Sequence, residues 1–255
     1  MTTFRLATIN VHQFRAVENG MNNVDDLVSI LKPLNLDLLV AEEVKDGEDW
    51  KRFCQDLSLS NSIFGCSEYE HFGNGIASCH SIQSYSNQTS SLSCVGGTRA
   101  LLQCSLDGFE NITFAVTHLD YLNEDDRLTQ MNEFNPCKNN IDILIGDMNA
   151  LTRDDYSDEY YKNIVAGQRE RTRWETPRFD LTKLITDEWK YKDAFKLMNP
   201  QIKDEEVVTC AYGTRIDYIY VHPCINSHWK LTKCSIIDTK GATDHNIVFA
   251  EFKLT

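Results

Sequence analysis

The stretch IDILIGDMNAL (residues 141–151) joins an apolar run to a polar end. Its run ILIG carries no polar side chain and is typical of a strand that is buried on both faces. Asp147 and Asn149 follow at once, and residues two apart in an extended chain point to the same side. An acid and an amide that end a buried strand need partners, so the stretch predicts either a capped loop or a catalytic site.

Four other apolar runs, LATIN, LLVA, ITFAV and IVFAEF, also have polar residues at one end. These residues are Asn10, Glu42, Glu43, His118, Asp244 and His245. The last two precede their run, so they would meet the others if that strand ran antiparallel. Polar groups at the same end of neighbouring strands converge on one crevice, and together these ends predict a site.

Taken singly, most of these residues have an ordinary structural explanation. Asn10 alone is typical of a turn, and His118 alone of a hydrogen-bonded structural histidine. Glu43 is harder to explain, because a carboxylate beside a core needs a cation or donors. Glu42 could equally be the functional acid, since alternation places it on the opposite face of the strand from Glu43.

Asp217 lies inside the apolar run RIDYIYV (215–221). A buried aspartate is costly unless it is paired, and a histidine N–H is a natural partner. We therefore expect Asp217 to pair with His245 and to fix the tautomer of that imidazole.

The combined set contains carboxylates, amides and histidines, but no cysteine. Such donors suit a hard cation, Mg²⁺ or Mn²⁺. Phosphoryl transfer to water is the chemistry that most needs this set, because it requires charge compensation, a positioned water and a stabilised leaving oxygen.

The bulk properties narrow the function further. The 255 residues carry a formal net charge of -13 with a pI near 4.9, which weighs against coating nucleic acid by bulk attraction. No apolar run approaches the length of a membrane span, and no signal peptide is evident. The nine cysteines are odd in number without a C-x2-C pair, so we expect free thiols and an intracellular protein, cytoplasmic or nuclear. We also expect a monomer. The sequons at Asn87 and Asn111 do not change that view.

Apolar alternation and helical periodicity predict one α/β domain over residues 1–255. The expected strands are 6–11, 37–44, 75–79, 98–106, 111–119, 141–147, 215–222 and 244–254. The expected helices are 23–35, 48–57, 123–134, 155–171 and 180–189, with Asn23 as a cap for the first. Hairpin-like neighbours (98–106 with 111–119) alternate with strand–helix–strand units, which favours a pair of mixed sheets covered by helices.

The ordered motifs resemble the endonuclease/exonuclease/phosphatase superfamily, the relatives of pancreatic deoxyribonuclease (DNase I). They span almost the whole chain: TINV (8–11), AEEV (41–44), GNGIAS (73–78), GTRALLQC (97–104), VTHL (116–119), IGDMNA (145–150), RIDYIYV (215–221) and ATDHNIVFAEF (242–252). The resemblance implies a four-layer α/β/β/α sandwich with the site at one end.

The resemblance also implies roles. Glu43 resembles the principal metal ligand, with Asn10 and Asp244 in the same shell. The implied catalytic residues are His118, Asp147, Asn149, Asp217 and His245. Asp147 would orient or activate water, His118 and Asn149 would contact the phosphate, and His245, held by Asp217, would lie beside the scissile bond. Glu42 aligns with the amide of the family's usual glutamine–glutamate pair.

Two positions depart from the family pattern. Many relatives follow the TINV-like strand with an acid or asparagine and then glycine, whereas this chain reads His12-Gln13. That change puts any metal or substrate contact from position 12 in doubt. Glu42 adds a charge near the site, which could alter metal binding.

The segment 150–181 follows the Asp147 turn and could overhang the site. Its local positive charge and stacking surface come from Arg169, Arg171, Arg173 and Trp174. These side chains could grip a phosphate or stack on a base, or they could belong to an amphipathic surface helix. Arg99 could face the crevice or form a salt bridge at the strand edge.

We therefore expect a Mg²⁺- or Mn²⁺-dependent phosphodiesterase or nuclease that acts on a phosphate ester in a nucleic acid or nucleotide-like substrate. The same site would also serve a phosphomonoesterase for inositol phosphates or nucleotides, or a tyrosyl-DNA phosphodiesterase. A hypothesis of another class is a catalytically silent binding protein on this scaffold.

Overall fold

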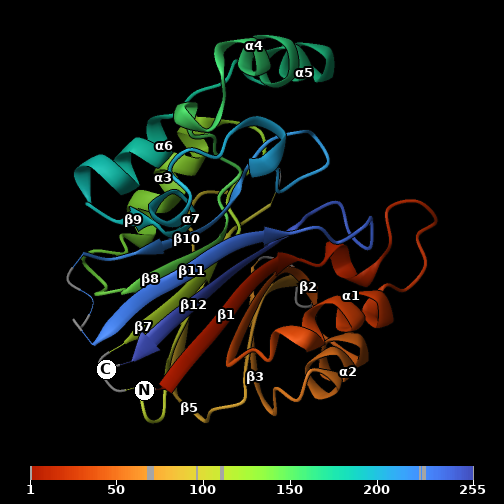
Figure 1. The fold of residues 1–255 in the computed structure, drawn as a ribbon, viewed down its shortest axis with the longest axis vertical. Helices are drawn as coiled ribbons and strands as arrows, with labels where there is room; N and C mark the ends of the chain where they lie inside the picture. The colour runs from red at the N-terminus through yellow and green to blue at the C-terminus, as the bar shows by residue number, and fades with distance from the viewer. Residues whose placement is uncertain are drawn as a thin grey trace.

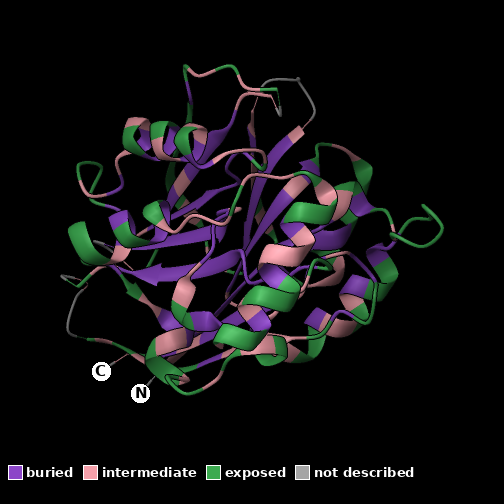
Figure 2. Cartoon of the chain, turned by 90° about the horizontal axis from the view of Figure 1, so that it is seen from above, coloured by how far each residue is buried: buried purple, intermediate pink, exposed green. Residues whose placement is uncertain are grey.

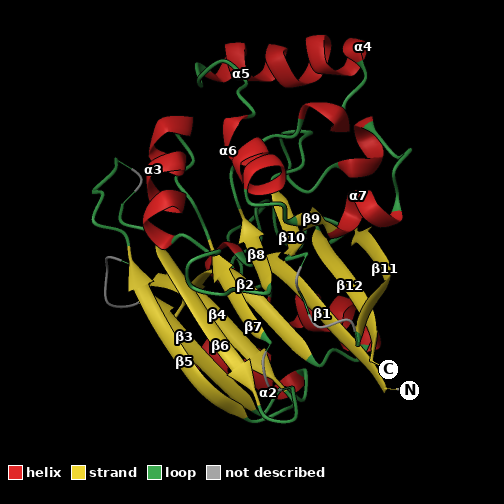
Figure 3. Ribbon diagram, turned by 90° about the vertical axis from the view of Figure 1, so that its left-hand side faces the viewer, coloured by secondary structure: helices red, strands yellow, loops and turns green. Residues whose placement is uncertain are grey.

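The computed structural model describes residues 2–67, 72–95, 97–109, 112–223, 225 and 228–254. In this part of the chain, two six-stranded sheets pack face to face with helices outside them (Figures 1 and 3). The arrangement is the predicted four-layer sandwich with two mixed sheets. None of the helices in these residues is long and apolar enough to cross a membrane.

The first sheet has the strand order β11-β12-β1-β2-β4-β3. Its strands are β1 (Thr2–Asn10), β2 (Leu38–Lys45), β3 (Asn61–Cys66), β4 (Phe72–Ser78), β11 (Trp229–Ile237) and β12 (Ile247–Leu254). β1 runs parallel to β2 and antiparallel to β12. The start of β12 therefore lies beside the ends of β1 and β2, as the sequence predicted.

The second sheet has the strand order β5-β6-β7-β8-β10-β9. Its strands are β5 (Ile82–Thr89), β6 (Ala100–Leu106), β7 (Thr113–Thr117), β8 (Ile143–Asp147), β9 (Lys192–Asp193) and β10 (Asp217–Val221). β6 and β7 form the predicted antiparallel pair, and β7 runs parallel to β8. β10 is antiparallel to β8, and its register sets Asp217 opposite Asp147.

The helices form the outer layers. They are α1 (Val24–Leu31), α2 (Glu48–Asp56), α3 (Glu124–Phe134), α4 (Asp158–Tyr160), α5 (Gly167–Thr172), α6 (Asp180–Lys183) and α7 (Ala194–Met198). Two π-helical segments, Tyr161–Ala166 and Leu184–Glu188, continue α4 and α6. In Figure 3, α4 and α5 lie beyond the end of the second sheet toward which β8 points.

Three apolar clusters hold these layers together. The largest lies between the sheets, where Leu6 and Val40 of the first pack with Val116 and Ile145 of the second. A second joins the first sheet to α1 and α2, and a third joins the second sheet to α3 and α6. Figure 2 shows the consequence: the strands are mostly buried and the helices are buried along one face.

The four edge strands, β3, β5, β9 and β11, are those that the sequence did not predict. β5 is exposed along almost its whole length, because an edge strand has a neighbour on one side only and keeps polar side chains in water. Its segment therefore lacks the apolar run by which the inner strands were recognised.

Asn23 occupies the N-cap position of α1, but its side chain does not cap the helix; its Nδ2 donates to the Ala242 carbonyl at 2.7 Å instead. The cysteines in the described residues are all free, as expected. Asn111, the first residue of the predicted 111–119 strand and of one sequon, lies outside the described residues, as does Cys224.

Candidate active site

A cavity of about 390 Å³ opens where β1, β2 and β8 end and β12 begins. The predicted residues that line it are Glu43, Arg99, His118, Asp147, Asn149, Trp174, Asp244 and His245. Asn10 and Asp217 are both buried and support this wall from behind. The structure thus brings together side chains from both sheets, which are far apart in the sequence.

Asp147 is the centre of the polar cluster. Its Oδ2 lies 3.3 Å from Asn10 Nδ2, 3.5 Å from His118 Nε2 and 3.8 Å from His245 Nε2. Burial, together with the nearby Asp217 carboxylate, raises the pKa of Asp147 to about 7. A carboxyl group with a pKa near 7 is suited to accept a proton at neutral pH.

The predicted pair of Asp217 and His245 is present. His245 Nδ1 donates to Asp217 Oδ2 at 2.9 Å and to Oδ1 at 3.1 Å, so Nε2 faces the cavity. Burial alone would lower the pKa of His245, but the adjacent Asp217 carboxylate outweighs it and raises that pKa well above the usual value. His245 is therefore an imidazolium that can donate from Nε2.

His118 has the opposite electrostatic environment. Burial, with the positive charges of Arg99 and His245 nearby, lowers the pKa of His118 well below its usual value. Two buried histidines on either side of Asp147 thus differ in protonation, one neutral and one charged. His118 can therefore act as a neutral hydrogen-bonding group and His245 as a proton donor.

Asn149 is fixed by two hydrogen bonds. Its backbone N–H donates to Asp147 Oδ1 at 2.9 Å, and its Nδ2 donates to the Leu119 carbonyl at 3.1 Å. The residue adopts φ 48°, a left-handed conformation that asparagine tolerates. Asn149 lines the cavity, and these two bonds leave the second N–H of its amide unused.

The ambiguity between Glu42 and Glu43 is resolved by a bulge in β2. Glu43 has φ 53° there and reaches the cavity, where its Oε1 accepts from Asn10 Nδ2 at 3.2 Å. Glu42 points into the core, where Thr8 Oγ1 donates to its Oε1 at 2.6 Å. Burial raises the pKa of Glu42 well above the usual value, which favours its neutral form.

Arg99 lines the cavity. It is 5% exposed, and its Nε has no hydrogen-bond partner. No carboxylate within the described ranges forms an ion pair with Arg99. A buried guanidinium without a counter-ion is costly, and an anionic ligand in the cavity would supply one.

The segment after β8 contributes differently from expectation. Trp174 lines the cavity, but Arg171 and Arg173 do not. Arg171 bonds to Gln168 on the outer side of α5, and Arg173 ends that helix in a left-handed conformation. Arg169 lines the cavity in their place, with its guanidinium 5.2 Å from the Trp174 ring.

The sequence reasoning missed the aromatic residues at the mouth of the cavity, which are Phe72, Tyr121 and Tyr212. Tyr212 makes an edge contact with Trp174 at a centroid distance of 4.7 Å. Tyr121 and Tyr212 are both more than two-fifths exposed. The position of Tyr121, three residues after His118, was the sequence signal that could have found it.

Comparisons with known proteins agree on the fold. No family model matches the sequence, and no curated protein matches it. Among solved structures, an endonuclease/exonuclease/phosphatase from Beutenbergia cavernae has a TM-score of 0.74 at 18% identity, covering 100% of this chain and 72% of its own. The 3'-5' exonuclease NExo from Neisseria meningitidis has a TM-score of 0.69 at 17% identity, covering 98% and 100%. The 2',3'-cyclic phosphatase ANGEL2 has a TM-score of 0.68 at 14% identity, covering 98% and 95%. The chain therefore has the DNase I-like fold of the endonuclease/exonuclease/phosphatase superfamily.

Proposed function

We propose that this protein is a divalent-metal-dependent phosphodiesterase that hydrolyses a phosphate ester in a nucleic acid or nucleotide-like substrate. The observation that carries the proposal is that one cavity contains two kinds of charged group without counter-ions. Its carboxylates need a cation, and the buried guanidinium of Arg99 needs an anion. A metal ion and a phosphate group together satisfy both.

The donor set fits a hard divalent cation. Glu43 and Asp244 offer carboxylate oxygens at the cavity, with the buried Asn10 amide beside Glu43. In the described part of the chain no lysine or arginine forms an ion pair with either carboxylate. Oxygen donors of this kind are those that Mg²⁺ and Mn²⁺ prefer. Such an ion supplies positive charge that offsets the charge of the phosphate as the reaction proceeds.

The protein groups around that charge have complementary tasks. Asp147 orients the attacking water and takes up its proton. Arg99, neutral His118 and the Asn149 amide hold the non-bridging oxygens of the phosphate. The His245 imidazolium, fixed by Asp217, donates its Nε2 proton to the departing oxygen.

The aromatic side chains at the mouth of the cavity favour a substrate that carries a nucleobase. Trp174, Tyr121 and Tyr212 offer aromatic faces or edges within one cavity, and base stacking on such side chains contributes roughly 1–3 kcal/mol per base. The net charge of -13 favours a short or end-bound substrate over a long duplex. We further propose that residues 1–255 act as one domain and as a monomer.

Two other functions use the same groups. A phosphomonoesterase for nucleotides or inositol phosphates would need the same metal and Arg99, and a tyrosyl-DNA phosphodiesterase could use the aromatic mouth for its tyrosyl group. The structural neighbours include both an exonuclease and a cyclic phosphatase. A catalytically silent binding protein on this scaffold would show no turnover, and failure to bind Mg²⁺ or Mn²⁺ would also favour it.

A substrate screen tests the proposal. The purified chain is incubated with Mg²⁺ or Mn²⁺ and a dinucleotide, single-stranded DNA, RNA, a nucleoside monophosphate, an inositol phosphate or a phosphotyrosyl oligonucleotide. We expect dinucleotide cleavage that stops with EDTA and falls by about 10²–10⁴-fold in Asp147→Asn and His245→Gln.

Asp142→Asn is the matched control, because Asp142 precedes the other end of β8 and accepts a hydrogen bond from the Thr113 backbone. This variant should keep its activity. Turnover of phosphomonoesters alone would replace the proposed substrate class. Metal binding without turnover of any substrate would favour the silent binding protein.

A further inference from the structure

His12 lies beside Glu43 and Asp244, the two carboxylates of the candidate metal site. It follows β1 directly, and its Nδ1 lies 3.4 Å from Asp244 Oδ1 and 3.9 Å from Glu43 Oε2. Its side chain is 42% exposed, so the imidazole stands at the rim of the site and not in the core. This is the position at which the sequence departs from the family pattern.

The backbone holds His12 there at an energetic cost. His12, Gln13 and Phe14 have φ values of 48°, 55° and 59°, three left-handed residues in succession without a glycine. Each costs on the order of 1 kcal/mol. Buried Phe14, which packs against Phe53 at 5.2 Å, anchors the turn, and the His12 N–H donates to Asn10 Oδ1 at 3.1 Å.

Each of the two distances from His12 Nδ1 is longer than a direct hydrogen bond and is compatible with a pair of ligands on one ion. An N–H···O bond spans about 2.7–3.2 Å, and both measured separations are longer. Two ligands at about 2.1 Å from one ion lie roughly 3.0 Å apart in octahedral and 3.4 Å apart in tetrahedral geometry, and opposite octahedral ligands lie about 4.2 Å apart. The 3.4 Å and 3.9 Å separations fall within this range.

We propose that His12 is a direct ligand of the metal and shifts the preference of the site from Mg²⁺ to cations that accept nitrogen, such as Mn²⁺, Co²⁺ or Zn²⁺. The proposal rests on the proposed function, because it concerns the same metal. Mg²⁺ favours oxygen donors, whereas imidazole suits the transition metals and zinc. An imidazole in the shell therefore changes which cation binds most tightly.

The alternative role for His12 predicts the opposite sign. If His12 were only an imidazolium that offsets the charge of Glu43 and Asp244, it would compete with a metal ion for those carboxylates. Its removal would then strengthen the binding of every divalent cation. As a ligand, its removal weakens binding, and it does so most for the cations that favour nitrogen.

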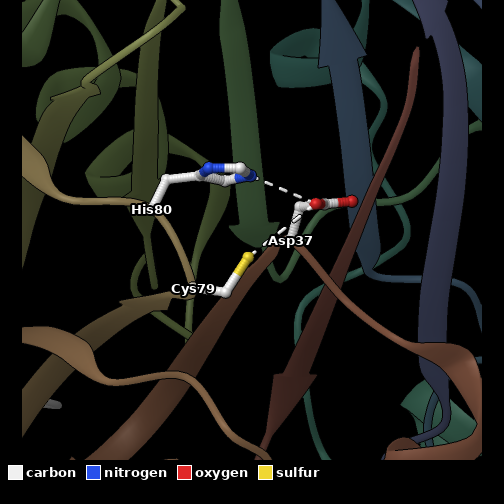
Figure 4. A group of neighbouring side chains, drawn as sticks. All are labelled: Asp37, Cys79 and His80. Carbon is white, nitrogen blue, oxygen red and sulfur yellow. Dashed lines mark hydrogen bonds and ion pairs between the residues drawn. The ribbon is translucent and has the colours of Figure 1, made fainter.

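A second imidazole–carboxylate group supplies the control. Asp37, Cys79 and His80 converge at the opposite end of the first sheet, with their ligand atoms within 4.8 Å of one another (Figure 4). Asp37 precedes β2, so about 20 Å of strand separates it from Glu43. Its oxygens already accept from the Arg5 backbone N–H at 2.8 Å and face His80 Nε2 at 3.1 Å.

The experiment uses the full chain carrying Cys79→Ser and His80→Asn, which removes that second group from metal titrations. Calorimetry with Mg²⁺ and Mn²⁺ compares this parent with a His12→Asn derivative, because asparagine tolerates the left-handed backbone. We expect the Kd for Mn²⁺ to rise at least about tenfold and the Kd for Mg²⁺ by less than about threefold. Pulsed electron paramagnetic resonance of bound Mn²⁺ should show a directly coordinated ¹⁴N in the parent, and this coupling should be lost in His12→Asn.

Unchanged or tighter Mn²⁺ binding in His12→Asn, an equal loss for both cations, or retained ¹⁴N coupling would overturn the role of His12 and leave the proposed function standing. Absence of binding of either cation by the parent would overturn both. Asp244→Asn should weaken both cations alike, which shows that the titrations report on this site.

Discussion

The Asp147 carboxyl group lies where its own charge is disfavoured. Because burial and Asp217 raise its pKa from 3.8 to about 7, the folded metal-free protein binds more protons than the unfolded chain across that interval. The free energy of unfolding therefore falls as the pH rises through it. We expect this group alone to lower the free energy of unfolding by about 2 kcal/mol between pH 5 and pH 7.

Urea unfolding at both pH values, with EDTA present, measures this effect. Asp147→Asn has no charge to gain, so its stability should depend less on pH over the same interval by about that amount. An identical pH dependence in the wild type and in Asp147→Asn would show that Asp147 titrates normally.

Single residues were predicted from the sequence only where a strand fixed them. Asp147 and Asn149 follow a buried strand, and the need of buried Asp217 for a donor identified His245. The arginines after β8 could not be sorted in the same way. Which of Arg169 and Arg171 faces inward depends on how a short helix is rotated about its axis, and that is set by tertiary packing.

At the scale of elements, a buried ion cluster fastens the segment that carries Trp174 to α3. Arg127, 1% exposed, contacts Glu124 and Glu175 and donates to the Asp120 carbonyl at 3.1 Å. Arg127→Leu would remove the cation that contacts buried Glu124 and would leave Glu175 with Arg169 alone, 3.9 Å away. We expect a loss of about 3–5 kcal/mol in the free energy of unfolding, against less than about 0.5 kcal/mol for exposed Arg171→Leu.

Denaturant titration compares the two arginine variants. Equal stability of Arg127→Leu and the wild type would mean that this cluster does not hold the segment in place.

Trp174 itself should act on substrate binding. We expect Trp174→Ala to raise KM for a dinucleotide about tenfold, from the loss of roughly 1–3 kcal/mol of stacking, with little effect on an inositol phosphate that has no base. Steady-state kinetics on both substrates, with Arg171→Ala as the control outside the cavity, measures the difference. Equal increases in KM for both substrates would argue against a base-stacking role.

Inner strands were predictable because burial on both faces leaves an apolar run, as in β2 and β8. The edge strands were not, since β5 is exposed along most of its length and its segment, IQSYSNQT, has no apolar alternation. The aromatic mouth was also missed, because Tyr121 and Tyr212 lie in loops whose positions depend on the whole sandwich.

At the scale of the whole molecule, charge limits the substrate. The chain carries a net charge of -13, and of its described lysines and arginines only Arg99 and Arg169 line the cavity. Two phosphate contacts give a slope of about -1.4 in log K against log salt for a single strand. Fluorescence anisotropy of a short labelled oligonucleotide with Asp147→Asn should return a slope no steeper than about -2. A slope near -5 would indicate that the protein contacts many phosphates of a long strand. That result would contradict the account of a short substrate.

Hydrolysis in H₂¹⁸O tests most directly whether water positioned at Asp147 attacks phosphorus. The wild-type protein cleaves a dinucleotide in the presence of Mn²⁺, and mass spectrometry measures the masses of both products. The label should enter the phosphate of the product and not the hydroxyl of the leaving nucleoside, and Asp147→Asn, folded as judged by circular dichroism, should release almost no product. Label in the leaving hydroxyl, or wild-type turnover in Asp147→Asn, would contradict the assignment of this cavity as a phosphoesterase site.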